Sequence, residues 1–164
     1  MKKVTVLLTT YSDWVSKLVG ICSGRGYMHA SIGLEDEPNT FYSFNYRGFC
    51  VETLEKHRRR GVRQSVGYEL SVSDAAYESL HRQVDGFKSH TSDFEYTRLG
   101  VVFCLLGIPF RWKRHYFCSQ FVAEMLKKSE AFHLRKSAEL YMPNAFCKEL
   151  CGSRQLLNIC PNPV

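Results

Sequence analysis

The stretch YFCSQFVAEML, residues 116–126, has the spacing of a single helix and places a cysteine near its beginning. Counted from Cys118, apolar residues fall at positions i+3, i+4, i+7 and i+8, which are Phe121, Val122, Met125 and Leu126. Residues with this spacing share one face of an α-helix. The pattern predicts an amphipathic helix that begins at Cys118 and carries the thiol on its inward face. Such a cysteine is either a small core residue or a nucleophile.

The patterns on either side of this helix favour the α+β fold class. β-rich or alternating segments predict strands at 3–9, 28–34, 41–46 and 63–72. Helical spacing predicts helices at 12–23, 73–90 and 142–151, and Ser73 or Asp74 caps the second of them. Residues 51–61 are interpreted as a connection. The segment 91–117 is interpreted as a turn, a short buried helix and a basic loop, and the C-terminal tail is interpreted as irregular. We therefore expect one domain over residues 1–164, with helices packed on a small antiparallel sheet.

The composition is that of an ordinary globular protein, with 45% apolar and 23% charged residues among 164. The N-terminal apolar run is too short for a signal peptide, and LGVVFCLLGIPF, residues 99–110, is too short to span a bilayer. We expect a cytoplasmic protein whose seven cysteines are mostly free thiols. Cys147 and Cys151 lack further metal ligands at short spacing, so neither a metal nor an organic cofactor is expected.

The net charge of +6 is partly concentrated in HRRRGVR, residues 57–63. This run is either a patch for an anionic partner or a solvated loop between strands. It lacks interleaved aromatic residues and any helix-turn-helix or zinc-finger context, so the loop interpretation is favoured and no nucleic-acid partner is expected.

A nucleophilic cysteine needs a base, and His29 is the best candidate among the six histidines. A thiol attacks as its thiolate, which a helix N-terminus and a nearby imidazolium both stabilise. In MHASIGL, residues 28–34, one strand face is apolar, and the other carries His29, Ser31 and Gly33. That small, polar face leaves room for a thiol to approach the imidazole.

The imidazole in turn needs an orienting group, which the next strand is expected to supply. In TFYSFN, residues 40–45, Ser43 and Asn45 lie on one face with Phe41. Either polar side chain could reach the distal ring nitrogen, and the register of the hairpin decides which.

Taken together, GYMHASIGL, TFYSFN and YFCSQFVAEML resemble the circularly permuted NlpC-type cysteine hydrolases, a papain-like group that includes YiiX-like amidases and relatives of lecithin:retinol acyltransferase. The resemblance covers roughly residues 3–128 and is most specific in the cysteine helix. In this group the histidine precedes the cysteine in the chain, as His29 precedes Cys118. The resemblance implies a permuted papain-like fold. It also implies that Tyr96, in FEYTRLG, helps to bind the oxyanion together with the backbone N–H of Cys118.

The resemblance further implies a cysteine peptidase or amidase that cleaves an amide or related acyl bond, in a peptide, a peptidoglycan fragment or a small amide, through an acyl-thioester. Cys118 attacks, His29 transfers the proton and Ser43 holds the imidazole. Relatives often carry His or Glu as the third residue on the strand after the histidine, and TFYSFN has neither.

Two alternatives stay open. One is a lipid-directed thiol acyltransferase or lipase, in which the apolar run 99–110 and the basic RWKR meet a membrane surface; burial of that run is the favoured interpretation. The other is a binding module that retains the fold without catalysis, which the missing charged third residue suggests.

Overall fold

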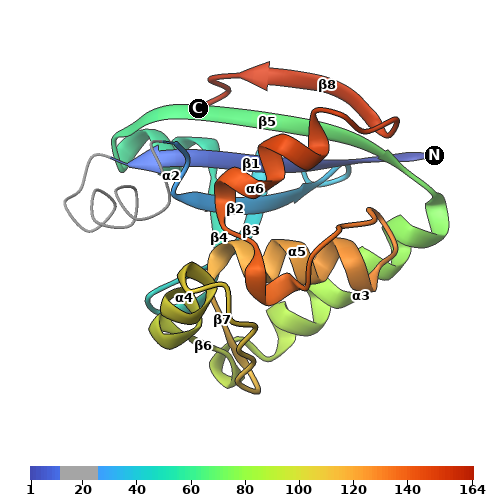
Figure 1. The fold of residues 1–164 in the computed structure, drawn as a ribbon. Coiled ribbons are helices and arrows are strands. Elements are labelled where there is room, and N and C mark those ends of the chain that lie inside the picture. Colours follow the sequence, from blue (N-terminus) through green and yellow to red (C-terminus); the bar gives the residue numbers. More distant parts are fainter. Residues whose placement is uncertain (12–25) are drawn as a thin grey trace.

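The computed structural model describes residues 1–11 and 26–164. The helix expected at 12–23 lies outside the described residues. Within them the fold is α+β, built on a six-stranded antiparallel sheet with the strand order β4-β3-β2-β1-β5-β8 (Figure 1). The strands are β1 (Lys2–Tyr11), β2 (His29–Leu34), β3 (Thr40–Asn45), β4 (Gly48–Thr53), β5 (Val62–Val72) and β8 (Leu156–Pro161).

The four predicted strands are confirmed, and the sheet has two further strands that the sequence did not predict. The first is β4, which begins before the segment 51–61 interpreted as a connection and extends into it. At two positions of β4 the burial is the opposite of what hydrophobicity predicts, because the apolar Val51 is exposed and the charged Glu52 is fully buried. The second is β8, in the tail interpreted as irregular. It pairs only with β5, at the edge of the sheet, and most of its residues remain exposed, so it lacks the apolar alternation of a half-buried strand.

The described helices are α2 (Leu54–Arg59), α3 (Asp74–Ser89), α4 (Arg98–Leu105), α5 (Cys118–Lys128) and α6 (Pro143–Leu150), with short 3₁₀ turns at Thr91–Asp93 and Ala138–Leu140. The predicted N-cap of α3 is confirmed, because the Ser73 hydroxyl accepts a hydrogen bond from the Ala76 N–H at 3.2 Å. Helix α5 begins at Cys118 as predicted. Two short strands, β6 (Glu95–Tyr96) and β7 (His115–Tyr116), pair in parallel beside its start.

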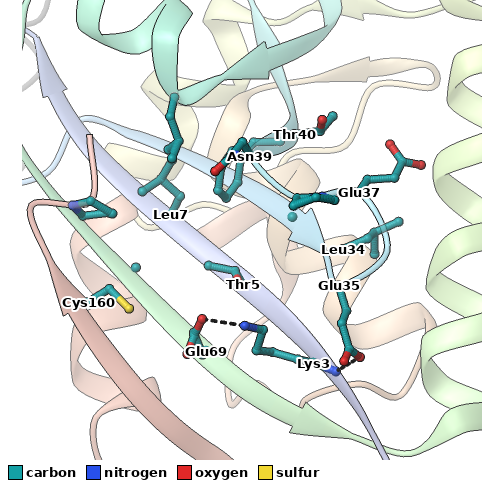
Figure 2. Close-up of a pocket in the computed structure, with 16 residues that line it drawn as sticks. Lys3, Thr5, Leu7, Leu34, Glu35, Glu37, Asn39, Thr40, Glu69 and Cys160 are labelled. Atoms are coloured by element: carbon teal, nitrogen blue, oxygen red, sulfur yellow. Dashed lines mark hydrogen bonds and ion pairs between the residues drawn. The ribbon is translucent and has the colours of Figure 1, made fainter.

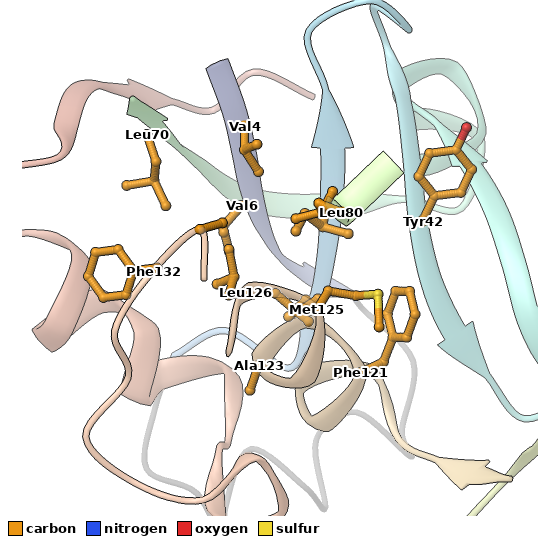
Figure 3. Close-up of a cluster of buried hydrophobic side chains, with 14 of the residues drawn as sticks. Val4, Val6, Tyr42, Leu70, Leu80, Phe121, Ala123, Met125, Leu126 and Phe132 are labelled. Carbon is orange, nitrogen blue, oxygen red and sulfur yellow. The ribbon is translucent and has the colours of Figure 1, made fainter. Parts of the chain in front are cut away.

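The hydrophobic core lies between one face of the sheet and helices α3 and α5 (Figure 1). From β1 it takes alternate side chains, including Val4 and Val6, and from α5 it takes Phe121, Met125 and Leu126 (Figure 3). All residues from Cys118 to Leu126 are buried. This burial stabilises α5 by packing and fixes its N-terminus against β2 and β3.

The sheet opens at the end where β2 begins. Strand β2 pairs with β1 along its whole length, from Val4 opposite Leu34 to Thr9 opposite His29. With β3 it pairs only through Ile32 and Gly33. The ladder between β2 and β3 therefore stops short of His29, which lies at the end of β2 nearest the beginning of α5.

The expected buried helix within residues 99–110 forms as α4, but the prediction that it is buried is wrong. Only Gly100 and Cys104 of α4 are buried. Leu99, Val102 and Leu106 are 52%, 51% and 66% exposed. In the described part of the chain, no helix is both long and apolar enough to cross a membrane.

Candidate active site

Cys118 is the first residue of α5, and its thiol is nearly buried at 8% exposure. The preceding residue, Phe117, makes no side-chain capping bond, so the first N–H groups of the helix are left without a side-chain cap. Burial opposes ionisation of the thiol. The hydrogen bond to His29, the positive imidazolium and backbone N–H groups outweigh that effect and lower the pKa of Cys118.

His29 lies between the thiol and a carboxylate. Its Nε2 is 2.7 Å from Oε2 of Glu52, which leaves Nδ1 for the hydrogen bond with the Cys118 side chain. The ring is 9% exposed. Burial disfavours the imidazolium, but the Glu52 charge and the hydrogen bonds to Glu52 and Cys118 raise the pKa of His29 well above its usual value of 6.5. The geometry therefore favours a thiolate–imidazolium pair.

Glu52 is fully buried on β4 and has a partner at each carboxylate oxygen. Oε2 accepts from His29, and Oε1 accepts from Nη1 of Arg60 at 2.8 Å. Burial raises the pKa of the carboxyl, but the charges of His29 and Arg60 and the hydrogen bond from His29 lower it to about 2. Glu52 is therefore ionised at neutral pH and holds the imidazole in one orientation.

A second histidine, His57, packs against this carboxylate from helix α2. Its Nε2 is 3.5 Å from Oε2 of Glu52, and its Nδ1 is 2.7 Å from the Tyr11 hydroxyl. The ring is fully buried, and burial together with the nearby positive charges of His29 and Arg60 lowers the pKa of His57 to about 4 despite the attraction of Glu52. His57 is thus neutral at pH 7, with one edge toward Glu52 and the other toward Tyr11.

The corner between β4 and α2 brings these groups together. The N-cap of α2 is Thr53, whose hydroxyl accepts from the Lys56 N–H at 3.1 Å. The cap follows Glu52 directly and starts the helix that carries His57, and Arg60 is the C-cap at the other end of that helix. Part of the basic run HRRRGVR therefore serves the buried carboxylate rather than forming only a solvated loop.

Ser43 and Asn45 do not orient the imidazole, so that prediction is wrong. The Ser43 hydroxyl donates to the Ala30 carbonyl at 2.7 Å, where no ladder pair joins β2 and β3. The side-chain oxygen of Asn45 accepts from the Arg47 N–H at 2.8 Å. Ser43 therefore holds the strands together at the open end of the sheet, and Glu52 takes the orienting position.

Tyr96 lies close enough to Cys118 to interact with it electrostatically. Strand β6 aligns Tyr96 with Tyr116, two residues before Cys118, and the Thr97 N–H donates to the Tyr116 carbonyl at 3.1 Å. Burial and the negative charge of Cys118 raise the pKa of Tyr96. The phenol therefore keeps its proton and can act as a hydrogen-bond donor.

One feature of the sequence does indicate Glu52. Residues 48–53, GFCVET, are long enough to form a further antiparallel strand after TFYSFN. That strand would carry the Glu52 carboxylate near the expected pair of Cys118 and His29. The basic residues that follow in 56–60 favour a solvated connection instead. No local sequence pattern indicates a role in the site for Arg60, His57 or Tyr11, because their roles depend on the buried Glu52 carboxylate.

The described cysteines form no disulfide, and one cavity lies away from this site. All six cysteines in the described ranges are free thiols, and those ranges contain no group of three His, Cys, Asp or Glu residues that could hold a metal ion. A cavity of about 230 Å³ lies over the other face of the sheet, and its lining includes Thr5, Cys160 and the ion pair of Lys3 with Glu69 (Figure 2). Neither Cys118 nor His29 lines it.

Comparison with known proteins gives no match: no protein-family model matches the chain, and no curated protein is found to be similar to it.

Proposed function

We propose that this protein is a cysteine hydrolase with a circularly permuted papain-like fold, which cleaves an amide or related acyl bond through an acyl-thioester. The observation that carries the proposal is the hydrogen-bonded series from the Cys118 thiol through the His29 ring to the buried Glu52 carboxylate. A nucleophile, a base and an orienting group in this arrangement are the parts that acyl transfer requires. The order of His29 before Cys118 is the order of the permuted group.

In the proposed reaction, the Cys118 thiolate attacks the substrate carbonyl and forms a tetrahedral oxyanion. The His29 imidazolium gives its proton to the leaving amine as the C–N bond breaks, and an acyl-thioester remains. Water then attacks the thioester while His29 takes one of its protons. The C–S bond breaks, the acid leaves, and the thiolate–imidazolium pair is restored. Glu52 keeps the ring aligned and stabilises its positive charge throughout.

Two donors are positioned to stabilise the oxyanion. The Cys118 N–H belongs to the first turn of α5, where backbone N–H groups have no partner within the helix. The Tyr96 hydroxyl, kept protonated by its raised pKa, is the second donor. Preorganised donors of this kind each contribute roughly 3 kcal/mol of transition-state stabilisation.

A second candidate is the lipid-directed thiol acyltransferase or lipase. It uses the same Cys118, His29 and Glu52, with an acyl chain in place of a peptide. The specific observation in its favour is the exposed apolar face of α4, a helix that begins two residues after Tyr96. The alternative of a non-catalytic binding module was suggested by the missing charged third residue, and Glu52 removes that reason. A cytoplasmic location, where thiols stay reduced, suits either enzyme.

The test is to trap the acyl-enzyme. The protein is incubated with a panel of activated esters and amides carrying peptidyl or acyl groups, quenched in acid and digested, and the modified peptide is identified by mass spectrometry. We expect acylation of Cys118, and loss of turnover by about a thousandfold or more in Cys118→Ala and His29→Ala.

Cys104→Ala is the matched control, because Cys104 is also buried and lies outside the series. It should retain turnover. Full turnover in folded Cys118→Ala, or acylation of another residue in the wild type, would refute the proposal.

A further inference from the structure

Helix α4 and the loop after it present apolar side chains to solvent. We define the α4 patch by six residues that are all exposed: Leu99, Val102, Leu105, Leu106, Ile108 and Trp112. Exposed apolar residues scattered singly are ordinary on protein surfaces, whereas a contiguous group marks an interaction site. These six lie within residues 99–112, on one short helix and the loop that continues it.

The helical part of the α4 patch lies on one face. At about 100° per residue, Leu99, Val102, Leu105 and Leu106 fall within an arc of roughly 120° on the helix. The buried residues Gly100 and Cys104 lie on the opposite side. The helix therefore has its small residues against the protein and its large apolar residues in solvent, the reverse of a helix that packs on its own core.

The loop that extends the patch is held in shape. Gly107 ends the helix with φ +72°, and the Ile108 N–H donates to the Phe103 carbonyl at 2.9 Å. The rings of Phe103 and Phe110 stack with centroids 4.7 Å apart. The ring of Trp112 stacks on His115 at 4.0 Å. The apolar groups are thus presented by fixed backbone.

The charged side chains of the segment that carries the patch are all positive. The sequence has no acidic residue from 96 to 123, and it carries Arg98, Arg111, Lys113 and Arg114 at the two ends of the patch. Arg111 pairs with Glu124 and Arg114 lies 3.5 Å from Asp93, but both guanidinium groups remain more than half exposed. Apolar side chains bordered by cations fit the interface of an anionic bilayer, where acyl chains lie beneath negative headgroups.

We infer that the α4 patch docks the protein on the surface of membranes that contain anionic lipids. The apolar residues enter the headgroup region, Trp112 sits at its level, and the flanking cations meet the lipid charges. Both ends of the patch lead into the candidate site, through Tyr96 at one end and through β7 to Cys118 at the other. Docking would bring that site close to the membrane, and docking itself does not require Cys118 to be a nucleophile.

The experiment is co-sedimentation of the full-length chain, as the inactive Cys118→Ala variant, with vesicles of phosphatidylcholine alone or mixed with phosphatidylglycerol. We expect binding to the mixed vesicles that weakens as ionic strength rises. Leu106→Asp should lower the affinity about tenfold or more, because it removes buried apolar area and adds a repelled charge. Lys113→Glu should lower it by a similar factor.

Two matched controls isolate the patch. Leu157→Asp makes the same change at an exposed leucine of β8, and Arg58→Glu makes the same charge reversal at an exposed arginine of α2. Both should bind nearly as the wild type does. In a Trp14→Phe background, where Trp112 is the only tryptophan, brominated lipids should quench the fluorescence.

The inference is overturned if neither vesicle binds, if both compositions bind equally at all salt concentrations, or if the patch variants bind no more weakly than their controls. It is also overturned if sedimentation equilibrium without lipid shows a dimer that Leu106→Asp dissociates, since the patch would then be covered by a second copy of the chain.

Discussion

Glu52 is an ionised carboxylate without exposed surface, and that is costly unless its charge is fully partnered. The partners are the His29 ring and the Arg60 guanidinium, one at each oxygen. Removing either would leave part of a buried charge uncompensated. The residue therefore acts on the thiol indirectly, by fixing the charge and orientation of the imidazole.

This role can be measured at His29 without a substrate. In Glu52→Gln the charge that offsets burial is gone, so the pKa of His29 should fall by more than one unit, equivalent to ~1.4 kcal/mol or more. Titration of the ring signals by NMR gives the pKa. Wild-type His29 should stay protonated well above pH 6.5, its usual midpoint.

Ser43→Ala is the control for that titration. Its hydroxyl bonds the Ala30 carbonyl rather than the ring, so its loss should lower the free energy of unfolding by about 1 kcal/mol and leave the His29 titration unchanged. If Ser43→Ala shifted the pKa of His29 as much as Glu52→Gln does, Glu52 would not be the orienting group.

At the scale of elements, helix α4 packs closely against Phe117, the residue that precedes Cys118. A Cβ on Gly100 would come within 2.6 Å of Thr97 Cγ2 and 3.2 Å of the Phe117 ring. Thr97 also caps α4, accepting from the Gly100 N–H at 2.9 Å. Gly100→Ala should therefore displace the cap, lower the free energy of unfolding by about 1–2 kcal/mol, and slow alkylation of Cys118.

Gly86→Ala, in the interior of α3, provides the comparison, because nothing lies within 4 Å of its added Cβ. It should raise the free energy of unfolding by about 0.5–1 kcal/mol. Urea denaturation of both variants checks the pair. Equal and small effects would mean that α4 does not pack tightly on Phe117.

The elements with strong periodicity were predictable from the sequence, and those shaped by tertiary context were not. Helix α5 and strand β2 follow their hydrophobic patterns because one face of each meets the core. Strand β4 was not predicted because it buries Glu52 and exposes Val51, and the burial of Glu52 depends on the charges of His29 and Arg60. Helix α4 formed as predicted, but its apolar composition normally indicates burial, and only the tertiary structure shows that its apolar face is exposed.

At the scale of the whole molecule, the candidate site joins α5, β2, β4 and α2, so its electrostatics contribute to global stability. His57 and Glu52 both have lowered pKa values in the folded protein, at about 4 and about 2, against ordinary values of 6.5 and 4.5. When folding lowers the pKa of a group, the stability that this provides is fully present at pH values above the pKa of the unfolded chain. It is lost as the pH falls toward the pKa of the folded protein.

The protein should therefore lose stability as pH falls from 6.5 to 4 through His57, and further between 4.5 and 2 through Glu52. The first loss is at most about 3 kcal/mol. Replacing His57 by Gln removes the titrating ring, so the free energy of unfolding should change less between pH 6.5 and 5 than in the wild type. Urea denaturation at these two pH values is the measurement, and an unchanged slope in His57→Gln would contradict it.

Part of the candidate site could be predicted from the sequence. Cys118, His29 and Tyr96 come together although 118 − 29 = 89 residues separate the first two. The helix start, the small strand face and the resemblance indicated all three. The third member, Glu52, depends on how β2, β3 and β4 lie beside one another in the sheet, which no local pattern in the sequence records.

The most direct test of the central claim, a thiolate–imidazolium pair at Cys118 and His29, is the pH dependence of Cys118 alkylation. The rate is measured with a small neutral reagent, by peptide mapping, in the wild type and in His29→Ala. A paired thiolate should react well below pH 8.5, the usual midpoint of a thiol, and His29→Ala should move its midpoint to 8.5 or above. A wild-type rate that rises only near pH 9 and is the same in His29→Ala would contradict the account.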